Sequence, residues 1–309
     1  MMKQKNHITW KNESEELYVL NLDQNFDPFE NYEGGIFKVK FSKGLFPAGE
    51  PNFKIESSLY NGNMVITHRI NSVSDLIDIV IANDAVRRMG IKNIELFIPY
   101  FPAARQDRIC NTGEAFTLKI FADMINSCGF DKVSILCPHS DVTPALINNV
   151  HILDEREWVL QSVLEMSNGK DINIVCPDAG AGKRVQKIIE YLSNQDRTHL
   201  YHLVRCEKIR DVKDGSLKEF YVGEGLVEGA PTLIIDDINC KGGTFLGLAE
   251  KLKEKNCGSL GLFTTHSDCQ EGVENVSRKF DFVFTTNSKQ NWSDILKFAG
   301  LTTFKIKYQ

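Results

Sequence analysis

From about residue 94 onward, short apolar segments alternate with polar breaks and with stretches of helical period. The apolar segments are rich in branched or aromatic residues and are apolar on both faces, as parallel strands covered by helices should be. The segments are NIELFIPYFP, VSILCPHSD, INIVCPDAG, TLIIDDIN, LGLFTTHSD and FVFTTNS, which begin at residues 93, 133, 172, 232, 260 and 282. This alternation predicts an α/β fold built on mostly parallel sheets flanked by helices.

Apolar residues between these segments recur at helical spacing and predict helices that pack on the sheets. The three predicted stripes are Ile77, Ile81, Ala85 and Met89 before Gly90; Phe116, Ile120 and Met124 before Gly129; and Val185, Ile188, Ile189 and Leu192. We interpret all of them as core-packing faces, without a role in chemistry.

Polar residues follow several of the predicted strands. In open α/β sheets, ligands bind just beyond the carboxyl ends of the strands, so the functional site is expected there. The segments concerned are Arg105–Arg108, His139–Asp141, Asp178–Arg184, Asp236–Thr244 and Thr264–Ser267. Residues 205–228 are also polar, and they connect two strands without a clear helix. A loop of that length inside a compact domain is usually functional or disordered.

The segment TLIIDDINCKGGTF, residues 232–245, carries the strongest chemical signal. Asp236 and Asp237 end a buried strand, and adjacent strand residues point to opposite faces, so the two are expected to act differently. The small-residue loop that follows opens a helix, whose free backbone amides suit a phosphate group. This arrangement resembles the phosphoribosyl-binding loop of type I phosphoribosyltransferases, in which carboxylates bind ribose hydroxyls and the loop holds the 5-phosphate. A purely structural turn with solvated acids is the alternative.

Two further segments are less specific by themselves. VCPDAGAGKRV, residues 175–185, is not a P-loop, because Pro177 and Arg184 stand where that motif needs glycine and Ser/Thr. It suits a metal-bound or phosphorylated sugar, or a plain helix entry. IPYFPAARQDR, residues 98–108, offers the guanidinium of Arg105 for phosphate or base stacking, or forms a surface salt-bridge cluster.

Composition and charge exclude several classes. The 309 residues are 42% hydrophobic and 25% charged, which is ordinary for a globular protein. A net charge of -5 and the lack of a basic patch argue against nucleic-acid binding, and no apolar run reaches the about 20 residues that span a bilayer. The start of the chain lacks the apolar core of a signal peptide, so we expect a cytoplasmic protein (host cytoplasm if phage-encoded) with no membrane partner. The eight scattered cysteines are expected to be buried thiols.

Taken in order, the segments resemble one family, the ribose-phosphate diphosphokinases or PRPP synthetases. The resemblance rests on Phe46-x-x-Gly49-Glu50, Pro-Tyr-Phe-Pro-x-Ala-Arg-Gln-Asp, an isolated His139, Pro-Asp-Ala-Gly-x-x-Lys-Arg-Val, and Asp-Asp before a Gly-Gly-Thr loop. It spans nearly the whole chain and implies two type I phosphoribosyltransferase-like domains. We expect the domains at 1–152 (ATP side) and 153–290 (ribose-phosphate side), with residues 291–309 as a tail packing back on the first. It also implies ATP and Mg²⁺ use, and a homo-oligomer of dimers building a hexamer.

The resemblance implies a role for each matching residue. ATP is expected at Phe46, Glu50, Arg105, Gln106 and Asp107, and the metal-linked positions are His139 and Asp178. Lys208 and Arg210 match the catalytic pair on the family's mobile loop, to which His139 is added as a catalytic position. The ribose-phosphate site is expected at Asp178, Asp236, Asp237, Asn239, Cys240, Lys241, Gly242, Gly243 and Thr244.

The implied enzyme is a diphosphotransferase that moves the β,γ-diphosphoryl group of ATP to the anomeric hydroxyl of a 5-phosphorylated ribose and releases AMP. Two departures bear on its details. The family's Asp-x-His has Cys137 in the first position, for which Asp141 could substitute, and the sugar-phosphate loop has Cys240 and Lys241 in place of Asp-Thr. The added cation favours a diphosphate ester. Some phage enzymes similar to PRPP synthetases act on ADP-ribose and make ADP-ribose pyrophosphate for NAD⁺ rebuilding.

The hypothesis that we favour slightly from this loop is ADP-ribose as acceptor, with ribose 5-phosphate close behind. Two other functions stay open. A catalytically silent regulatory paralogue could carry the change at Cys137, but it would not need Lys208, Arg210 and both loop carboxylates. A phosphoribosyltransferase would share the acidic loop, but not the segment around Arg105 or the second domain.

Overall fold

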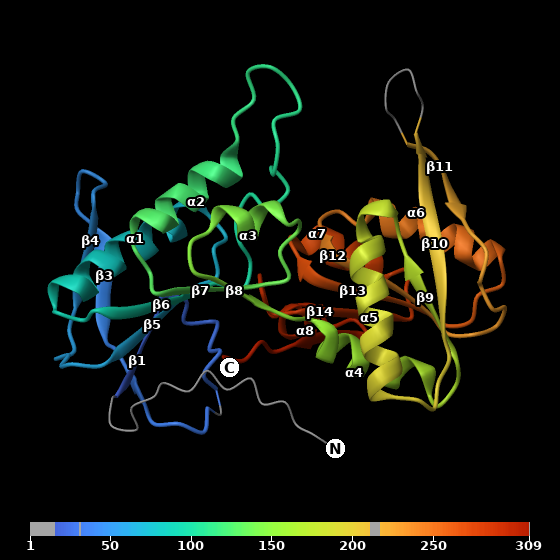
Figure 1. Cartoon of the computed structure of the whole chain (residues 1–309), viewed down its shortest axis with the longest axis horizontal. Coiled ribbons are helices and arrows are strands. Elements are labelled where there is room, and N and C mark those ends of the chain that lie inside the picture. Colours follow the sequence, from blue (N-terminus) through green and yellow to red (C-terminus); the bar gives the residue numbers. More distant parts are fainter. Residues whose placement is uncertain (1–15, 31, 211–216, 309) are drawn as a thin grey trace. The chain divides into compact units, whose positions relative to one another are not determined.

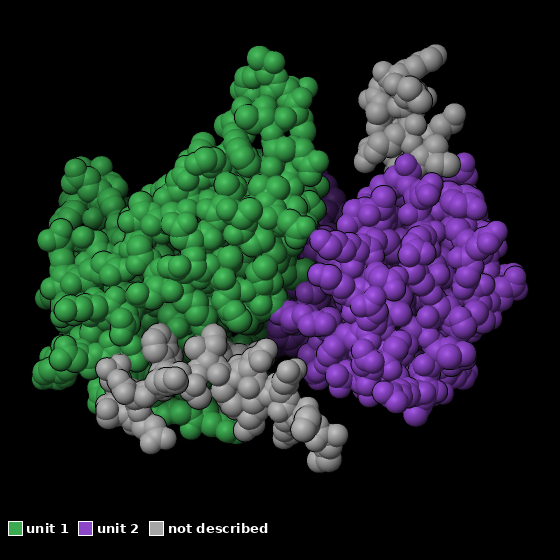
Figure 2. Space-filling model, viewed as in Figure 1, with its two compact units in different colours: residues 1–153, 306–309 green, residues 154–305 purple. Residues whose placement is uncertain are grey.

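The computed structural model describes residues 16–30, 32–210 and 217–308. The chain forms two compact units: residues 1–153 with 306–309, and residues 154–305 (Figure 2). Each unit has its own sheet and its own buried core, so each is described by itself.

The first unit is built on a six-stranded sheet in which every neighbouring pair of strands is parallel (Figure 1). The strand order is β2-β1-β5-β6-β7-β8. The bounds are β1 Leu17–Asn21, β2 Ile36–Lys38, β5 Asn63–Thr67, β6 Asn93–Phe97, β7 Lys132–Leu136 and β8 Val150–Leu153. The helices are α1 Val73–Arg88, α2 Thr117–Ser127 and α3 Val142–Leu146. An antiparallel hairpin, β3 Phe41–Leu45 and β4 Pro51–Ile55, stands apart from this sheet.

Helix α1 shows how the local sequence sets its ends. Ser72 and Asp75 form a capping box at its start, which satisfies backbone N–H groups that the helix leaves free. The turn after its end places Gly90 at φ +93, where a side chain would be strained. The sequence therefore determines the beginning and the end of the helix from a few positions.

The buried faces of α1 and α2 differ from the expected stripes. The buried residues of α1 are Leu76, Ile79, Ala82, Asn83 and Val86, and those of α2 are Leu118, Ala122 and Ile125. Met89 and Ile120, which the stripes placed in the core, are 38% and 50% exposed. Both helices carry apolar residues on two adjoining faces, and the position of the sheet decides which one is buried. The stripe of α5, Gly182–Gln195 in the second unit, is correct, with Val185, Ile188 and Leu192 buried.

The second unit contains a seven-stranded sheet in the order β11-β10-β9-β12-β13-β14-β15. All pairs are parallel except the edge pair β10–β11. The bounds are β9 Ile172–Cys176, β10 Tyr201–Arg210, β11 Leu217–Val222, β12 Thr232–Asn239, β13 Leu260–Ser267, β14 Phe282–Thr286 and β15 Leu301–Phe304. The helices are α4 Arg156–Ser167, α5 Gly182–Gln195, α6 Gly243–Glu254, α7 Gln270–Ser277 and α8 Trp292–Ile295, with a short 3-10 turn, η1, at Ala179–Ala181.

The central strands confirm the expected parallel α/β fold. Every residue of β9 and β13 is buried, as helices on both faces require. The expectation that residues 205–228 connect two strands as an irregular loop is wrong, because β10 and β11 pair antiparallel across part of this segment. Residues 211–216 lie outside the described part of the chain.

The C-terminal segment divides between the two units, which differs from the expected tail over residues 291–309. Strand β15 pairs with β14 and thus completes the second sheet. Residues 306–309 belong to the first unit, where Tyr308 stacks on Phe29 at a ring distance of 4.5 Å and donates a hydrogen bond of 2.8 Å to Glu95. The physical reason is strand pairing, since the main chain of residues 301–304 supplies hydrogen bonds that the edge of β14 lacks.

Two smaller expectations concern the burial of the cysteines and the lack of a membrane-spanning segment. No disulfide forms among the described residues, and Cys128, Cys137, Cys176 and Cys206 are buried, but Cys110 is exposed and the other three cysteines are half-buried. Among the described residues, no helix has the length and apolar character needed to cross a membrane.

Candidate active site

The acidic end of β12 lies against one arginine. The Nη1 atom of Arg184, in the first turn of α5, donates to Oδ1 of Asp236 at 3.3 Å, and its Nη2 atom lies 3.3 Å from Oδ1 of Asp237. The side chain of Asp237 is 5% exposed and that of Asp236 is 16% exposed. One guanidinium thus contacts both carboxylates, and the expectation that the two act differently stays a prediction.

Burial changes the acidity of this pair. Burial and the nearby charge of Asp237 raise the pKa of Asp236 to about 7, and Arg184 opposes the shift. Two adjacent carboxylates share the charge of one cation, so the pair can hold a proton near neutral pH. The pair can therefore accept hydrogen bonds from hydroxyl groups and also exchange one proton.

A second ion pair lies next to the first. Asp178 follows β9 and caps η1, where its Oδ1 accepts a hydrogen bond of 3.2 Å from the N–H of Ala181. Its Oδ2 accepts a hydrogen bond of 2.6 Å from Nζ of Lys208 on β10. Burial by itself would raise the pKa of Asp178, but Lys208 and the backbone N–H groups hold it below its ordinary value. Arg210 ends β10, and its side chain lies outside the part of the structure that is described.

Cys176 lies near both groups of charges, since it interacts electrostatically with Asp178 and with Asp236. It ends β9, and burial followed by the charges of Asp178 and Asp236 raises the pKa of its thiol. The strands β9 and β12 are neighbours in the sheet, which brings their carboxyl ends together. Three carboxylates and two cations thus gather at one edge of the second sheet.

The loop between β12 and α6 is held close to α7 by glycines. Gly242 caps α6 at φ +82, and an added Cβ there would lie 2.9 Å from Val276. A Cβ on Gly272 of α7 would lie 1.6 Å from the carbonyl oxygen of Cys240. Because Gly242 has no side chain to cap α6, the first N–H groups of this helix can donate to a bound anion.

The remaining loop residues differ in environment. Asn239 is fully buried, and neither polar atom of its side chain has a hydrogen-bond partner in the described structure. Lys241, unlike Asn239, is exposed to solvent: its side chain is 73% exposed, and its Nζ atom lies 3.8 Å from Oε2 of Glu271. Gly243 is exposed and Thr244 half-buried at the start of α6. The loop thus presents backbone, a hydroxyl and one solvated cation.

The first unit gathers another set of predicted residues beyond β6 and β7. Arg105 and Gln106 are exposed, whereas Asp107 is buried. The carboxylate of Asp107 accepts hydrogen bonds of 2.7 and 3.2 Å from Arg108, which lower its pKa, and the charge of His139 lowers it further. Asp107 and His139 therefore lie close enough to interact.

The backbone has an unusual conformation two residues before His139, at Cys137. Cys137 is buried and has a φ of 39, in the left-handed region that most side chains avoid. Asp141 caps α3 with its backbone and is exposed. The hypothesis that Asp141 takes over from the family's missing carboxylate stays a prediction.

Phe46 and Glu50 close the turn of the β3–β4 hairpin. The N–H of Phe46 donates to the carbonyl of Glu50 at 2.8 Å, and Gly49 adopts φ +86 within the turn. Phe46 is 51% exposed, so its ring is available to stack on a base.

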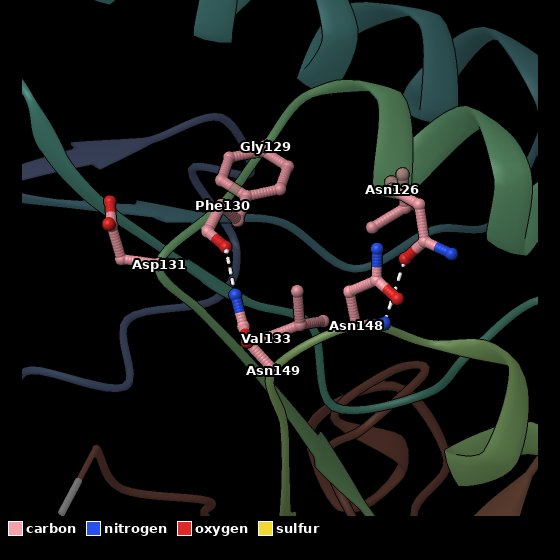
Figure 3. Close-up of a pocket in the computed structure, with 8 residues that line it drawn as sticks. Asn126, Gly129, Phe130, Asp131, Val133, Asn148 and Asn149 are labelled. Atoms are coloured by element: carbon pink, nitrogen blue, oxygen red, sulfur yellow. Dashed lines mark hydrogen bonds between the residues drawn. The ribbon is translucent and has the colours of Figure 1, made fainter.

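Sequence reasoning placed Arg184 inside a candidate segment but gave it no role. Its position in the first turn of α5, six residues after Asp178, was the available signal. The sequence did not indicate the small, partly open pocket in the first unit that is lined by Asn126, Phe130 and Asn149 among others (Figure 3). The side-chain amides of Asn126 and Asn149 donate to backbone carbonyls, so these groups are already used inside the fold.

Comparisons with known proteins find similarity to ribose-phosphate pyrophosphokinases. Residues 32–129 match the model of the N-terminal domain of ribose phosphate pyrophosphokinase. The ribose-phosphate pyrophosphokinase of Mycoplasma genitalium is 29% identical over 283 residues, which cover 87% of this chain and 81% of that protein. The ribose-phosphate pyrophosphokinase 3 of Saccharomyces cerevisiae is 28% identical over 272 residues, or 84% of this chain and 80% of its own length.

A solved structure agrees on the fold. The crystal structure of phosphoribosylpyrophosphate synthetase from Mycobacterium smegmatis matches with a TM-score of 0.79 at 19% identity, covering 94% of each chain. Mostly parallel sheets flanked by helices are common to both, as the sequence predicted.

Proposed function

We propose, from the similarity of this chain to ribose-phosphate pyrophosphokinases, that it is a diphosphotransferase that uses ATP to diphosphorylate a 5-phosphorylated ribose. In the reaction, the anomeric hydroxyl oxygen attacks the β-phosphorus of ATP and the bond from that phosphorus to the α–β bridging oxygen breaks. AMP leaves, and the hydroxyl proton passes to solvent or to a nearby base.

The observation that carries this proposal is the group of charges beyond β9, β10 and β12. Asp236 and Asp237 offer carboxylate oxygens to the ribose hydroxyls, while the start of α6 offers N–H groups to the 5-phosphate. Arg184 holds the two carboxylates in one orientation through its planar fork. A phosphorylated ribose fits this combination because it carries hydroxyls at one end and a dianion at the other.

Lys208 supplies the charge that the transferring group needs. Diphosphoryl transfer develops charge on the phosphate oxygens, so positioning and neutralisation dominate catalysis. The Nζ atom of Lys208 is held by Asp178 at 2.6 Å, where incoming phosphate oxygens would compete for it. We propose the same role for Arg210, two residues further along β10.

The residues present fit Mg²⁺ at Asp178 better than at His139. Mg²⁺ prefers oxygen ligands, and usually binds through one or two carboxylates together with substrate phosphates and water. Asp178 has a lowered pKa and therefore stays ionised at neutral pH, as such a ligand must. His139 offers nitrogen and would contact the ion indirectly. When bound, Mg²⁺ would neutralise phosphate charge.

We propose ribose 5-phosphate as the acceptor, because the relatives named above are ribose-phosphate pyrophosphokinases. Their names give no support to ADP-ribose, which the loop sequence favoured. The structure also weakens the argument from Lys241, since its ammonium lies near Glu271 and is largely solvated. A cation in that setting does not require a second phosphate.

The ATP side is proposed for the first unit. Phe46 and Glu50 on the β3–β4 hairpin would contact the adenine, and Arg105, Gln106 and Asp107 would contact the phosphates. We also propose that the protein assembles as dimers that build a hexamer, which the molar mass from light scattering would test.

The deciding experiment incubates the purified chain with Mg-ATP and either ribose 5-phosphate or ADP-ribose, and measures AMP together with the phosphorus NMR spectrum of the product. We expect AMP and a 1-diphosphate ester with ribose 5-phosphate. Better turnover of ADP-ribose than of ribose 5-phosphate would identify ADP-ribose as the acceptor. No AMP with either sugar would favour a silent paralogue. Release of diphosphate from PRPP and a base would indicate a phosphoribosyltransferase.

A further inference from the structure

Another group of ionisable side chains lies in the first unit, where β5 leads into α1 (Figure 1). His68 directly follows β5, and Asp75 and Asp78 lie in the first two turns of α1. One ligand atom from each of these three residues lies within 4.8 Å of the other two. None of them belongs to the proposed diphosphotransferase site.

His68 is the unusual member. It is 5% exposed, and neither of its ring nitrogens has a hydrogen-bond partner in the described structure. Buried polar atoms in native proteins are nearly always satisfied, so such a ring requires an explanation. Its Nε2 atom points into the cluster and lies 3.5 Å from Oδ1 of Asp75.

The two carboxylates are fixed by the fold. Oδ2 of Asp75 accepts hydrogen bonds of 2.8 and 2.7 Å from the N–H groups of Asn71 and Ser72, which directs Oδ1 toward His68. Asp78 lies three residues further along α1 and therefore on the same face. Its Oδ2 accepts a hydrogen bond of 2.7 Å from Nζ of Lys43 on β3.

We propose that His68, Asp75 and Asp78 bind a divalent transition-metal ion of the Zn²⁺ type, and that Lys43 competes with this ion for Asp78. One imidazole and two carboxylates are ligands that Zn²⁺ accepts, whereas Mg²⁺ has little affinity for nitrogen. With ligand bonds of about 2.0–2.1 Å, a tetrahedral ion holds its donor atoms about 3.3 Å apart. The distance between His68 and Asp75 is already close to this value, and the remaining donor needs only a small side-chain movement.

The competition with Lys43 has a structural consequence. The ion pair between Lys43 and Asp78 joins the β3–β4 hairpin to α1, and the side chain of Lys43 is 41% exposed. A bound ion would take over the charge of Asp78 and release this link. The hairpin would keep its packing through Phe41 and Phe53, whose rings stack on each other and pack against the core of the first unit.

The test uses the full chain, freed of metal with a chelator, and Zn²⁺ alone titrated in competition with a chromophoric chelator. We expect one bound Zn²⁺ ion whose affinity depends on this cluster. His68→Ala and Asp78→Asn should each weaken that affinity by more than about 100-fold, since even outer-shell changes cost about 10–100-fold. Lys43→Ala should tighten binding by up to about fivefold, the scale of an exposed ion pair. Asp84→Asn, which changes an exposed carboxylate further along α1, is the matched control and should have no effect.

Co²⁺ provides a second readout, because its visible spectrum reports the ligand types. Nitrogen and oxygen ligation that is lost in His68→Ala supports the site, whereas a thiolate band that persists in this variant would assign the ion to cysteines and overturn the proposal. Equal Zn²⁺ affinity in the parent and in Asp78→Asn would overturn it as well. If His68→Ala fails to fold, His68→Gln and the exposed variant Lys43→Ala still decide the question.

Discussion

The Nζ atom of Lys208 lies 2.6 Å from Oδ2 of Asp178, which joins a cation on β10 to a carboxylate beyond β9. The two residues are 30 positions apart, and the parallel pairing of β9 with β10 brings them together. The ion pair lowers the pKa of Asp178 and holds Lys208 in one place. Lys208 therefore has a structural partner before any substrate binds.

Lys208→Ala should reduce turnover by about 10³-fold or more, because it removes a cation that neutralises the transferring phosphates. AMP release at saturating Mg-ATP and sugar measures the effect. Lys187→Ala, an exposed lysine on α5 of the same unit, is the control and should retain the parent rate. Turnover of the Lys208 variant within a few-fold of the parent would remove Lys208 from the catalytic group.

Arg184→Gln should raise the KM for the phosphorylated ribose, because the two carboxylates lose the guanidinium that orients both of them. We also expect the free energy of unfolding to fall by about 1–3 kcal/mol, as when a buried polar group loses its partner. Arg184→Lys keeps the positive charge but lacks the planar fork, so its KM and its free energy of unfolding should lie between those of the parent and of Arg184→Gln. Substrate titrations and urea unfolding measure these effects, and an unchanged KM would contradict the role given to Arg184.

Stability should depend on pH through Asp236. Its pKa in the folded chain is raised to about 7 from an ordinary value of 3.8, so between these values the folded state binds more protons than the unfolded state. The free energy of unfolding should therefore decrease as pH rises from about 4 to about 7, and this contribution should be constant at higher pH. Urea unfolding of the parent and of Asp236→Asn across this range isolates the contribution. Identical pH dependence in both proteins would be incompatible with a raised pKa.

Gly272→Ala should disturb the phosphate loop from a distance. The new Cβ would lie 1.6 Å from the carbonyl oxygen of Cys240, so the loop or α7 must move. We expect a higher KM for the phosphorylated ribose and a smaller change for ATP. Gly44→Ala is a suitable control, because a Cβ at that position meets nothing within 4 Å. Equal changes in both KM values would argue against a local effect on the loop.

Much of the sheet core could be predicted from the sequence, since a run such as LGLFTTHS is apolar on both faces and becomes the fully buried β13. The buried face of α1 could not, because Ile77 and Leu76 are adjacent apolar positions and only the sheet determines which one is enclosed. Several other strands were also missed. β1 and the β3–β4 hairpin lie outside the alternating pattern, and β10 and β11 carry many polar residues.

For the candidate site, the sequence placed Asp178, Asp236 and Asp237 at strand ends and the family resemblance assigned them to one site, but neither indicated which cations they contact. Their residue types and their positions after apolar runs are local properties, which the order of amino acids determines directly. Arg184 contacts both members of the acidic pair, and Lys208 contacts Asp178, because strands distant in the sequence lie side by side in the sheet.

The amino-acid order by itself determined the α/β character, the ends of α1 and the kinds of chemistry carried by each loop. The tertiary structure decided which charges meet, which helix faces are enclosed and how far the pKa of Asp236 is raised. The reason is physical: caps and periodic patterns act over a few residues, whereas burial and Coulomb interactions depend on distances between atoms that only the folded chain brings together.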